Sequence, residues 1–99
     1  MKDLREKLAS TVNTGKIVYG YKETVEKLYF DSPLLVITSA NCPSPMNDRL
    51  KYLCALNKTP FLHSGENNQD LGGICARPHG VSVLAVINAG ESSILEGLK

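Results

Sequence analysis

Apolar residues recur along the chain at spacings that alternate between helical and strand-like. Leu4, Leu8 and Val12 fall on one helical face and predict a first helix from about Leu4 to Asn13. Gly15 lies just beyond its end, where helices commonly have a glycine. The short apolar run 17–19 then predicts a strand.

A second helix is predicted immediately after Gly20. Its spacing predicts an inward stripe made of Tyr21, Val25, Leu28 and Tyr29. The outward positions are then Lys22, Glu23, Glu26 and Lys27. Asp31-Ser32-Pro33 is expected to end the helix, because the residue before a proline is disfavoured in helical conformation.

The continuous apolar run 34–37 is typical of a strand that is covered on both faces and often parallel to its neighbours. Ser44 is expected to cap a third helix, with Pro45 at its first position. The buried positions expected in that helix are Met46, Leu50, Leu53 and Cys54.

The remaining pattern predicts two more strands and two more helices. Phe61 to His63 is expected as a third strand, and Val81 to Ile87 as the last and longest one. A fourth helix is expected around Leu71, Ile74 and Cys75, and a short closing helix around Ile94, Leu95 and Leu98.

This alternation of helices and strands implies an α/β fold, with a sheet covered by helices on both sides. In such three-layer folds, functional residues gather on loops beyond the strand ends. The loops at Gly20, at Asn41 and over 77–80 each join a strand and a helix. They are therefore expected to share one edge of the sheet.

Composition limits the classes of protein that the chain can belong to. Its 99 residues, 42% of them hydrophobic, suit one globular domain over residues 1–99. No apolar run approaches the ~20 residues that span a bilayer, and the charged first residues do not fit a signal peptide. An odd number of widely spaced cysteines fits reduced thiols in the cytosol. A soluble, intracellular protein that does not interact with membranes is expected.

The charge balance disfavours diffuse wrapping of a nucleic acid, because the formal net charge is only +1. It is compatible with a small, shape-selective contact, since local charge matters more than the sum. The start of the second helix offers such a place. Free backbone N–H groups and the helix dipole favour a phosphate or a base edge there, and Lys22 adds a full positive charge.

The sequence also bears on nucleotide hydrolysis and on metal or thiol chemistry. Gly15 and Gly20 are spaced as in a phosphate-binding P-loop, but Tyr21 stands where its lysine belongs, which argues against nucleotide hydrolysis. Cys75 and His79 are four apart without a second close pair, so neither a metal nor a cofactor is predicted. A small α/β enzyme using Cys42 or His79 remains an alternative of another class, although no pattern favours catalysis.

Several segments, in the right order and spacing over almost the whole chain, together resemble one known family. They are Thr14-Gly15-Lys16, Gly20-Tyr21-Lys22 with Thr24, Ala40-Asn41-Cys42-Pro43, Gly65 to Gly72, Arg77-Pro78-His79 with Val81-Ser82, and Ala89-Gly90-Glu91-Ser92 with Ile94-Leu95. In this combination the chain resembles the kink-turn RNA-binding family of ribosomal proteins, in its archaeal and eukaryotic large-subunit branch. The resemblance implies a three-layer α/β/α sandwich with a four-stranded mixed sheet.

The resemblance also implies a function and a set of site residues. The chain would be a structural constituent of the large ribosomal subunit on cytoplasmic ribosomes, with ribosomal RNA and neighbouring ribosomal proteins as partners and no small-molecule substrate. A related alternative is a kink-turn-binding subunit of a small nucleolar or RNase P particle. The implied RNA-binding residues are Lys16, Gly20, Tyr21, Lys22, Lys27, Asn41, Arg49, Arg77, His79 and Val81.

These residues have different implied roles. Gly20, Tyr21 and Lys22 would start the helix that enters beside sheared G·A pairs, and His79 and Val81 would cover the extruded base. Plausible phosphate contacts are Lys16, Lys27, Arg49 and Arg77. For Asn41, a base-edge contact and a purely structural role in closing its own loop both remain open.

Overall fold

The computed structural model describes residues 2–31, 33–88 and 90. Helices and strands alternate along it as the apolar pattern predicts. The elements are α1 (Lys2–Thr14), β1 (Lys16–Tyr19), α2 (Tyr21–Phe30), β2 (Leu35–Thr38), α3 (Ser44–Asn57), β3 (Phe61–His63), α4 (Asn68–Ile74) and β4 (Val83–Asn88). The closing helix expected around 94–98 lies outside the described residues.

The four strands form one mixed sheet in the order β1-β4-β2-β3. β4 runs antiparallel to both of its neighbours, and β2 runs parallel to β3. β1, β2 and β3 therefore all point the same way. Their carboxyl ends and the start of β4 lie at one edge of the sheet, which we call the loop edge.

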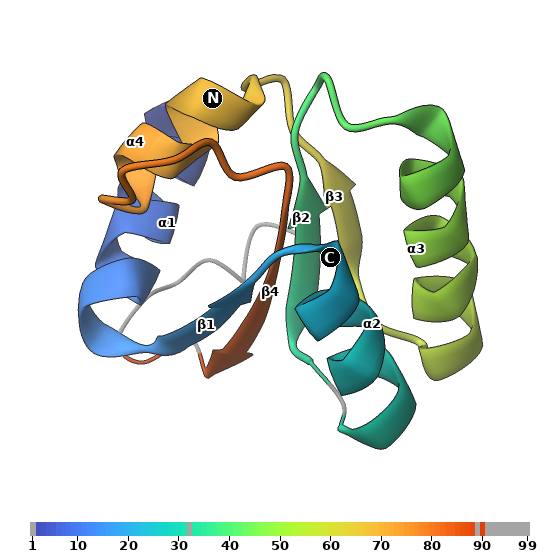
Figure 1. The fold of residues 1–99 in the computed structure, drawn as a ribbon. Coiled ribbons are helices and arrows are strands. Elements are labelled where there is room, and N and C mark those ends of the chain that lie inside the picture. Colours follow the sequence, from blue (N-terminus) through green and yellow to red (C-terminus); the bar gives the residue numbers. More distant parts are fainter. Residues whose placement is uncertain (1, 32, 89, 91–99) are drawn as a thin grey trace.

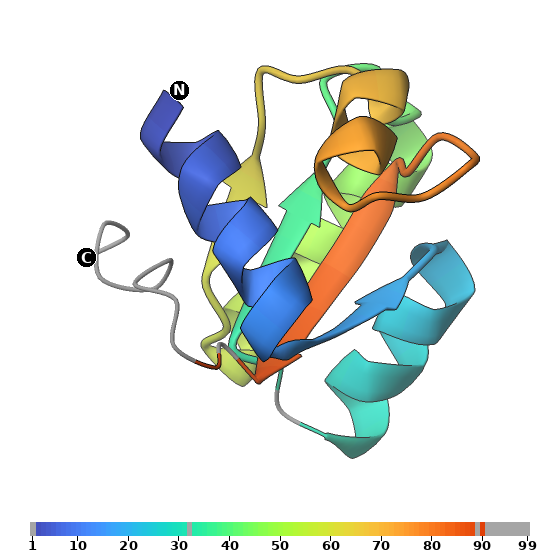
Figure 2. The ribbon, with the colours of Figure 1, turned by 90° about the vertical axis from the view of Figure 1, so that its left-hand side faces the viewer.

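Helices cover both faces of the sheet, so the predicted three-layer α/β/α sandwich is confirmed. Figure 1 shows α1 and α4 on one side and α2 and α3 on the other. Leu8 and Leu71 pack with Leu84 on the first face, and Leu28 and Leu50 belong to the core on the second face. Figure 2 shows α1 and α4 in front of the sheet.

Two expected features of the helices are wrong in detail. Tyr29 was expected to face inward, but its side chain is 57% exposed, and Thr24 is buried instead. The inward stripe passes through positions 21, 24, 25 and 28, and Tyr29 lies about 100° beyond Leu28 around the helix. Ser44 is the first helical residue and not the cap, because extended Pro43 precedes it at the cap position and no side chain caps this end.

The structure also corrects one strand boundary and settles the exposure of one loop residue. The last strand begins at Val83, and not at Val81, because the residues before it belong to a loop that hydrogen-bonds other loops. The sequence places Cys42 in a loop and leaves its exposure open, and the structure shows it only 8% exposed because it packs into the core beneath α2 and α3. Cys54 and Cys75 are buried core residues, as predicted.

Candidate nucleic-acid interface

The start of α2 is built on a backbone conformation that only glycine adopts easily. Gly20 has φ 100° and ψ 155°, and it immediately precedes the first helical residue, Tyr21. A non-glycine residue held in this region costs about 1–3 kcal/mol. No protein atom lies within 4 Å of the position that a Cβ would occupy, and no side chain caps the helix. The helix start is therefore open to close approach.

The two residues after Gly20 divide between core and surface. Tyr21 is partly buried and packs against the core under α2 and α3, whereas Lys22 is exposed. A positive side chain thus stands in the first turn of a helix whose free N–H groups already carry partial positive charge. An anion at this place would meet both.

The expected sharing of one sheet edge by the loops is confirmed by backbone hydrogen bonds between them. The Gly20 N–H donates to the carbonyl oxygen of Val83 over 2.8 Å, and the Ser39 N–H donates to that of Ser82 over 2.8 Å. The Ala40 N–H donates over 2.8 Å to the carbonyl of Glu66, in the loop after β3. The loop edge is consequently one connected surface.

Asn41 ties three of these loops together. Its Oδ1 accepts from the Ser39 hydroxyl and the Asn68 N–H, both over 2.9 Å, and its Nδ2 donates to Asn68 Oδ1 over 3.1 Å. Asn68 in turn accepts from the Val81 N–H through its own carbonyl oxygen. The structural role left open for Asn41 is therefore present, and its second Nδ2 hydrogen is not used in these bonds.

Replacing Asn41 with Ala is expected to lower the free energy of unfolding by about 1–2 kcal/mol, because three hydrogen bonds are lost at a partly exposed site. Urea unfolding followed by circular dichroism measures the change. Asn13→Ala at an exposed position of α1 is the matched control and should change stability by less than about 0.5 kcal/mol. Equal stability of the two variants would contradict the bracing role of Asn41.

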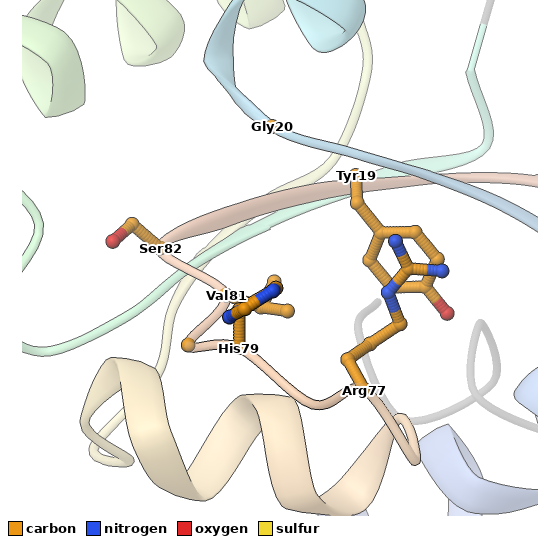
Figure 3. A pocket seen from close by; sticks show the side chains of 7 residues that line it. Tyr19, Gly20, Arg77, His79, Val81 and Ser82 are labelled. Carbon is orange, nitrogen blue, oxygen red and sulfur yellow. The ribbon is translucent and has the colours of Figure 1, made fainter.

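A pocket of about 180 Å³ opens on the loop edge beside Gly20. Its walls are Tyr19, Gly20, Arg77, His79, Gly80, Val81 and Ser82. His79 is exposed, while Val81 is 5% exposed and belongs to the core, so only a small part of its side chain reaches the surface. Figure 3 shows that the pocket is formed between the end of β1 and the loop before β4.

One wall of this pocket is a stacked cation and aromatic ring. The guanidinium carbon of Arg77 lies 4.4 Å from the centroid of the Tyr19 ring. Burial raises the pKa of Tyr19, the neighbouring Cys75 raises it further, chiefly through the negative charge of its thiolate form, and the Arg77 charge lowers it. The phenol therefore stays neutral beside a positive charge.

Seven of the ten predicted site residues lie on the loop edge: Gly20, Tyr21, Lys22, Asn41, Arg77, His79 and Val81. Lys16 begins β1 and pairs in register with Asn88, which places it at the opposite edge of the sheet. Lys27, two turns along α2, forms an ion pair with Asp31 at 3.2 Å. Arg49 on α3 donates over 3.0 Å to the Tyr29 hydroxyl. These three cations are separate from the pocket.

The thiols are poorly placed for catalysis. Burial raises the pKa of Cys42 and of Cys75, and it raises the pKa of Cys54 to about 11. A thiol nucleophile needs the opposite shift. Within residues 2–31, 33–88 and 90, no three potential metal ligands cluster together. No helix in the same ranges is long and apolar enough to cross a bilayer.

Stability should fall as the pH rises from about 9 through 11, because the unfolded chain ionises Cys54 near pH 9 and the folded chain only near 11. Below pH 9 the thiol is neutral in both states and has no effect on this balance. Thermal unfolding of the parent and of Cys54→Ala at pH 7.5 to 10.5 isolates the contribution. As the pH rises, the melting temperature of the parent should fall more than that of Cys54→Ala. A difference between the two that does not change with pH would contradict the raised pKa of Cys54.

Fold and site together define a small α/β domain with a connected loop surface around an open helix start. The chain belongs to the ribosomal protein L7Ae/L30e/S12e/Gadd45 family, whose model matches residues 2–96. The sequence segments predicted a resemblance to the archaeal and eukaryotic large-subunit branch called ribosomal protein thirty. The relatives described next confirm that resemblance.

The chain is 40% identical over 92 residues to large ribosomal subunit protein eL30B of Schizosaccharomyces pombe, covering 93% of this chain and 79% of that protein. It is 35% identical over 96 residues to large ribosomal subunit protein eL30 of Methanopyrus kandleri, covering 96% and 87% of the two chains. A solved structure of a protein with unknown function from Bacillus halodurans C superposes with a TM-score of 0.76 at 25% identity, over 98% of this chain and 95% of that one. These relatives give no support to the alternative of an enzyme.

The sequence patterns did not identify two residues of this surface. Tyr19 was assigned only to a short strand, and its position beside Arg77 depends on the pairing of β1 with β4. Asn68 was part of a quoted segment but had no assigned role, and its bonds to Asn41 arise from the parallel pairing of β2 and β3. The polar cluster Asn67-Asn68 at the start of a helix was the available signal.

Proposed function

We propose that this protein is a structural constituent of the large ribosomal subunit that binds and stabilises a kink-turn in ribosomal RNA. The observation that carries the proposal is Gly20, whose open, glycine-specific helix start stands beside Lys22 on the loop edge. The named relatives are large-subunit proteins, which supports the same role here. Its partners would be ribosomal RNA and neighbouring ribosomal proteins, in the cytoplasm.

The physical basis is the difference between kinked and straight RNA. An A-form duplex hides its base edges in a deep, narrow groove that side chains cannot enter. A kink-turn opens that groove at its sheared G·A pairs, extrudes a base and brings phosphates together. A compact positive helix start binds this shape better than the straight duplex, and so shifts the RNA toward the bent form.

The residues of the loop edge fit this task in two parts. The start of α2, with Gly20 and Lys22, would approach the G·A pairs, because no protein atom lies within 4 Å of a Cβ at Gly20. The pocket beside it, with His79 and the exposed part of Val81, would take the extruded base. Asn41 would keep its bracing bonds and offer its remaining amide hydrogen to the RNA.

The proposal is tested by titrating the purified protein with a kink-turn RNA and with a fully paired RNA of the same length, in gel shifts at one fixed salt concentration. Binding to the kinked RNA at least tenfold tighter, ~1.4 kcal/mol, is expected. Equal affinity for the two RNAs would overturn the proposal, since the net charge of +1 gives little sequence-independent attraction.

The related alternative, a subunit of a small nucleolar or RNase P particle, uses the same RNA chemistry in another complex. Sedimentation of cell extract through a sucrose gradient separates the two. We expect the protein to co-migrate with large ribosomal subunits, whereas recovery with a smaller particle would favour the alternative.

A further inference from the structure

Tyr19 lies beside the proposed RNA-binding residues and has no role in the function described so far. It is the last residue of β1, directly before Gly20, and it lines the same pocket as Arg77. The guanidinium carbon of Arg77 stands 4.4 Å from the ring centroid, within the ~6 Å over which a cation is attracted to an aromatic face. Figure 3 shows the guanidinium lying over the ring.

The Tyr19 ring is fixed from beneath. It is partly buried and packs against the core formed by α1, α4 and the sheet. The same core contains the thiol of Cys75, which is 3% exposed. A ring that packs against the core on this side of the sheet loses much of its freedom to move, and so it can support a charged group on an exposed face.

Arg77 is fixed by the backbone that precedes its side chain. Ala76 has a positive φ of 57°, which reverses the chain just after α4. The Arg77 N–H donates to the carbonyl of Gly72 over 2.8 Å, so the turn is closed onto the helix. On one side of this reversal, Cys75 lies in the core that Tyr19 packs against. On the other side, Arg77 lies over the Tyr19 ring.

The exposed guanidinium keeps its hydrogen-bond donors for an external ligand. No carboxylate within residues 6–31 and 33–88 forms an ion pair with Arg77, whereas Lys27 pairs with Asp31. A planar guanidinium that is stacked on a ring through one face still has five N–H groups along its edges, in a geometry that matches phosphate oxygens. Because the side chain is already ordered, less rotamer freedom is lost when such a ligand binds.

We infer that Tyr19 is a positioning residue, which holds the Arg77 guanidinium beside the pocket as a preorganised contact for an RNA phosphate. The inference rests on the proposed function and adds to it a residue and a mechanism. It distinguishes Arg77 from Lys27 and Arg49, which lie on the outer helices with partners of their own.

The test combines affinity with the salt dependence of binding for the parent, Arg77→Ala, Tyr19→Leu, Tyr19→Phe and the double variant Arg77→Ala/Tyr19→Leu. Arg77→Ala should weaken kink-turn binding roughly tenfold and reduce the slope of log affinity against log salt by roughly 0.7–0.9, the value for one phosphate contact. Tyr19→Leu should reproduce most of both changes although it removes no charge. The double variant should bind no more weakly than Arg77→Ala alone.

Tyr19→Phe keeps the ring that carries the cation and should bind within about twofold of the parent. A second readout is independent of RNA. The Arg77 side-chain Nε–H resonance, assigned in ¹⁵N-labelled protein, should carry a ring-current shift in the parent and in Tyr19→Phe, and lose it in Tyr19→Leu.

The outcomes distinguish a failure of the positioning role of Tyr19 from a failure of the proposed function. Suppose that the parent prefers kinked RNA. The positioning role alone would then be overturned if Tyr19→Leu bound as tightly as the parent, or if the losses in affinity of the two single variants added in the double variant. An unchanged salt slope in Arg77→Ala would overturn the phosphate contact. A parent that does not distinguish kinked from paired RNA would overturn the proposed function and this inference with it.

Discussion

Exchanging Gly20 for Glu and Lys22 for Ala together is expected to weaken binding of kink-turn RNA at least tenfold, ~1.4 kcal/mol. A glutamate at the helix start places a bulky, negative side chain where no protein atom now lies within 4 Å of the Cβ position. The second substitution removes the positive charge from the first turn. Titration at fixed salt measures the change.

A matched control keeps the change in charge and moves it away from the loop edge. Asn13→Glu with Lys51→Ala is suitable, because both residues are exposed, Asn13 precedes Lys16 at the opposite edge of the sheet, and Lys51 lies in the middle of α3. The control should bind within about threefold of the parent. Lys22→Ala alone tests the charge without the backbone strain of a substitution at Gly20. Equal binding by the double variant and its control would remove the start of α2 from the RNA interface.

Gly72→Ala is expected to destabilise the fold by about 1–3 kcal/mol, although Ala is the better helix former. A Cβ at this position would overlap the backbone carbonyl oxygen of His79 and would lie 3.3 Å from Gly80 Cα. Backbone atoms cannot rotate away as a flexible side chain can, so α4 and the loop over residues 75–82, called the pocket loop, must separate. Urea unfolding gives the change in the free energy of unfolding.

The neighbouring Gly73→Ala is the control for that experiment. It lies in the same helix, its Cβ would meet no atom within 4 Å, and its φ is not positive. The higher helix propensity of Ala should leave the protein as stable as the parent or up to about 1 kcal/mol more stable. If both variants were equally stable, close packing of α4 against the pocket loop would not be present in solution.

The order of helices and strands could be predicted from the sequence, because each helix has apolar residues along one face and each strand is an apolar run. Leu8, Leu28 and Leu50 show this, since their spacing alone placed them in the core. Predictions failed or stayed open where single positions depend on tertiary contacts. Tyr29 looked apolar enough for burial, but its hydroxyl accepts a hydrogen bond from Arg49 at the surface. The exposure of Cys42 was left open, and it is buried because it packs into the core beneath α2 and α3.

The candidate site could be predicted in part for the same reason. Glycine before a helix is a local signal, so Gly20 and Lys22 were found from sequence. The stacking of Arg77 on Tyr19 joins residues 58 positions apart through the pairing of β1 with β4, and no local pattern encodes it. Lys16, Lys27 and Arg49 were grouped with the site by the resemblance. The strand pairing places Lys16 at the opposite edge of the sheet, and Lys27 and Arg49 lie on α2 and α3, where each contacts another side chain.

The most direct test of the central claim is an NMR titration of ¹⁵N-labelled protein with a kink-turn RNA. We predict that the largest amide shift changes fall on residues 20–22, on Asn41 and on residues 77–82, which together make up the loop edge and its pocket. Shift changes centred on the opposite edge around Lys16, or on the outer faces of α2 and α3, would contradict the claim that the start of α2 binds the RNA.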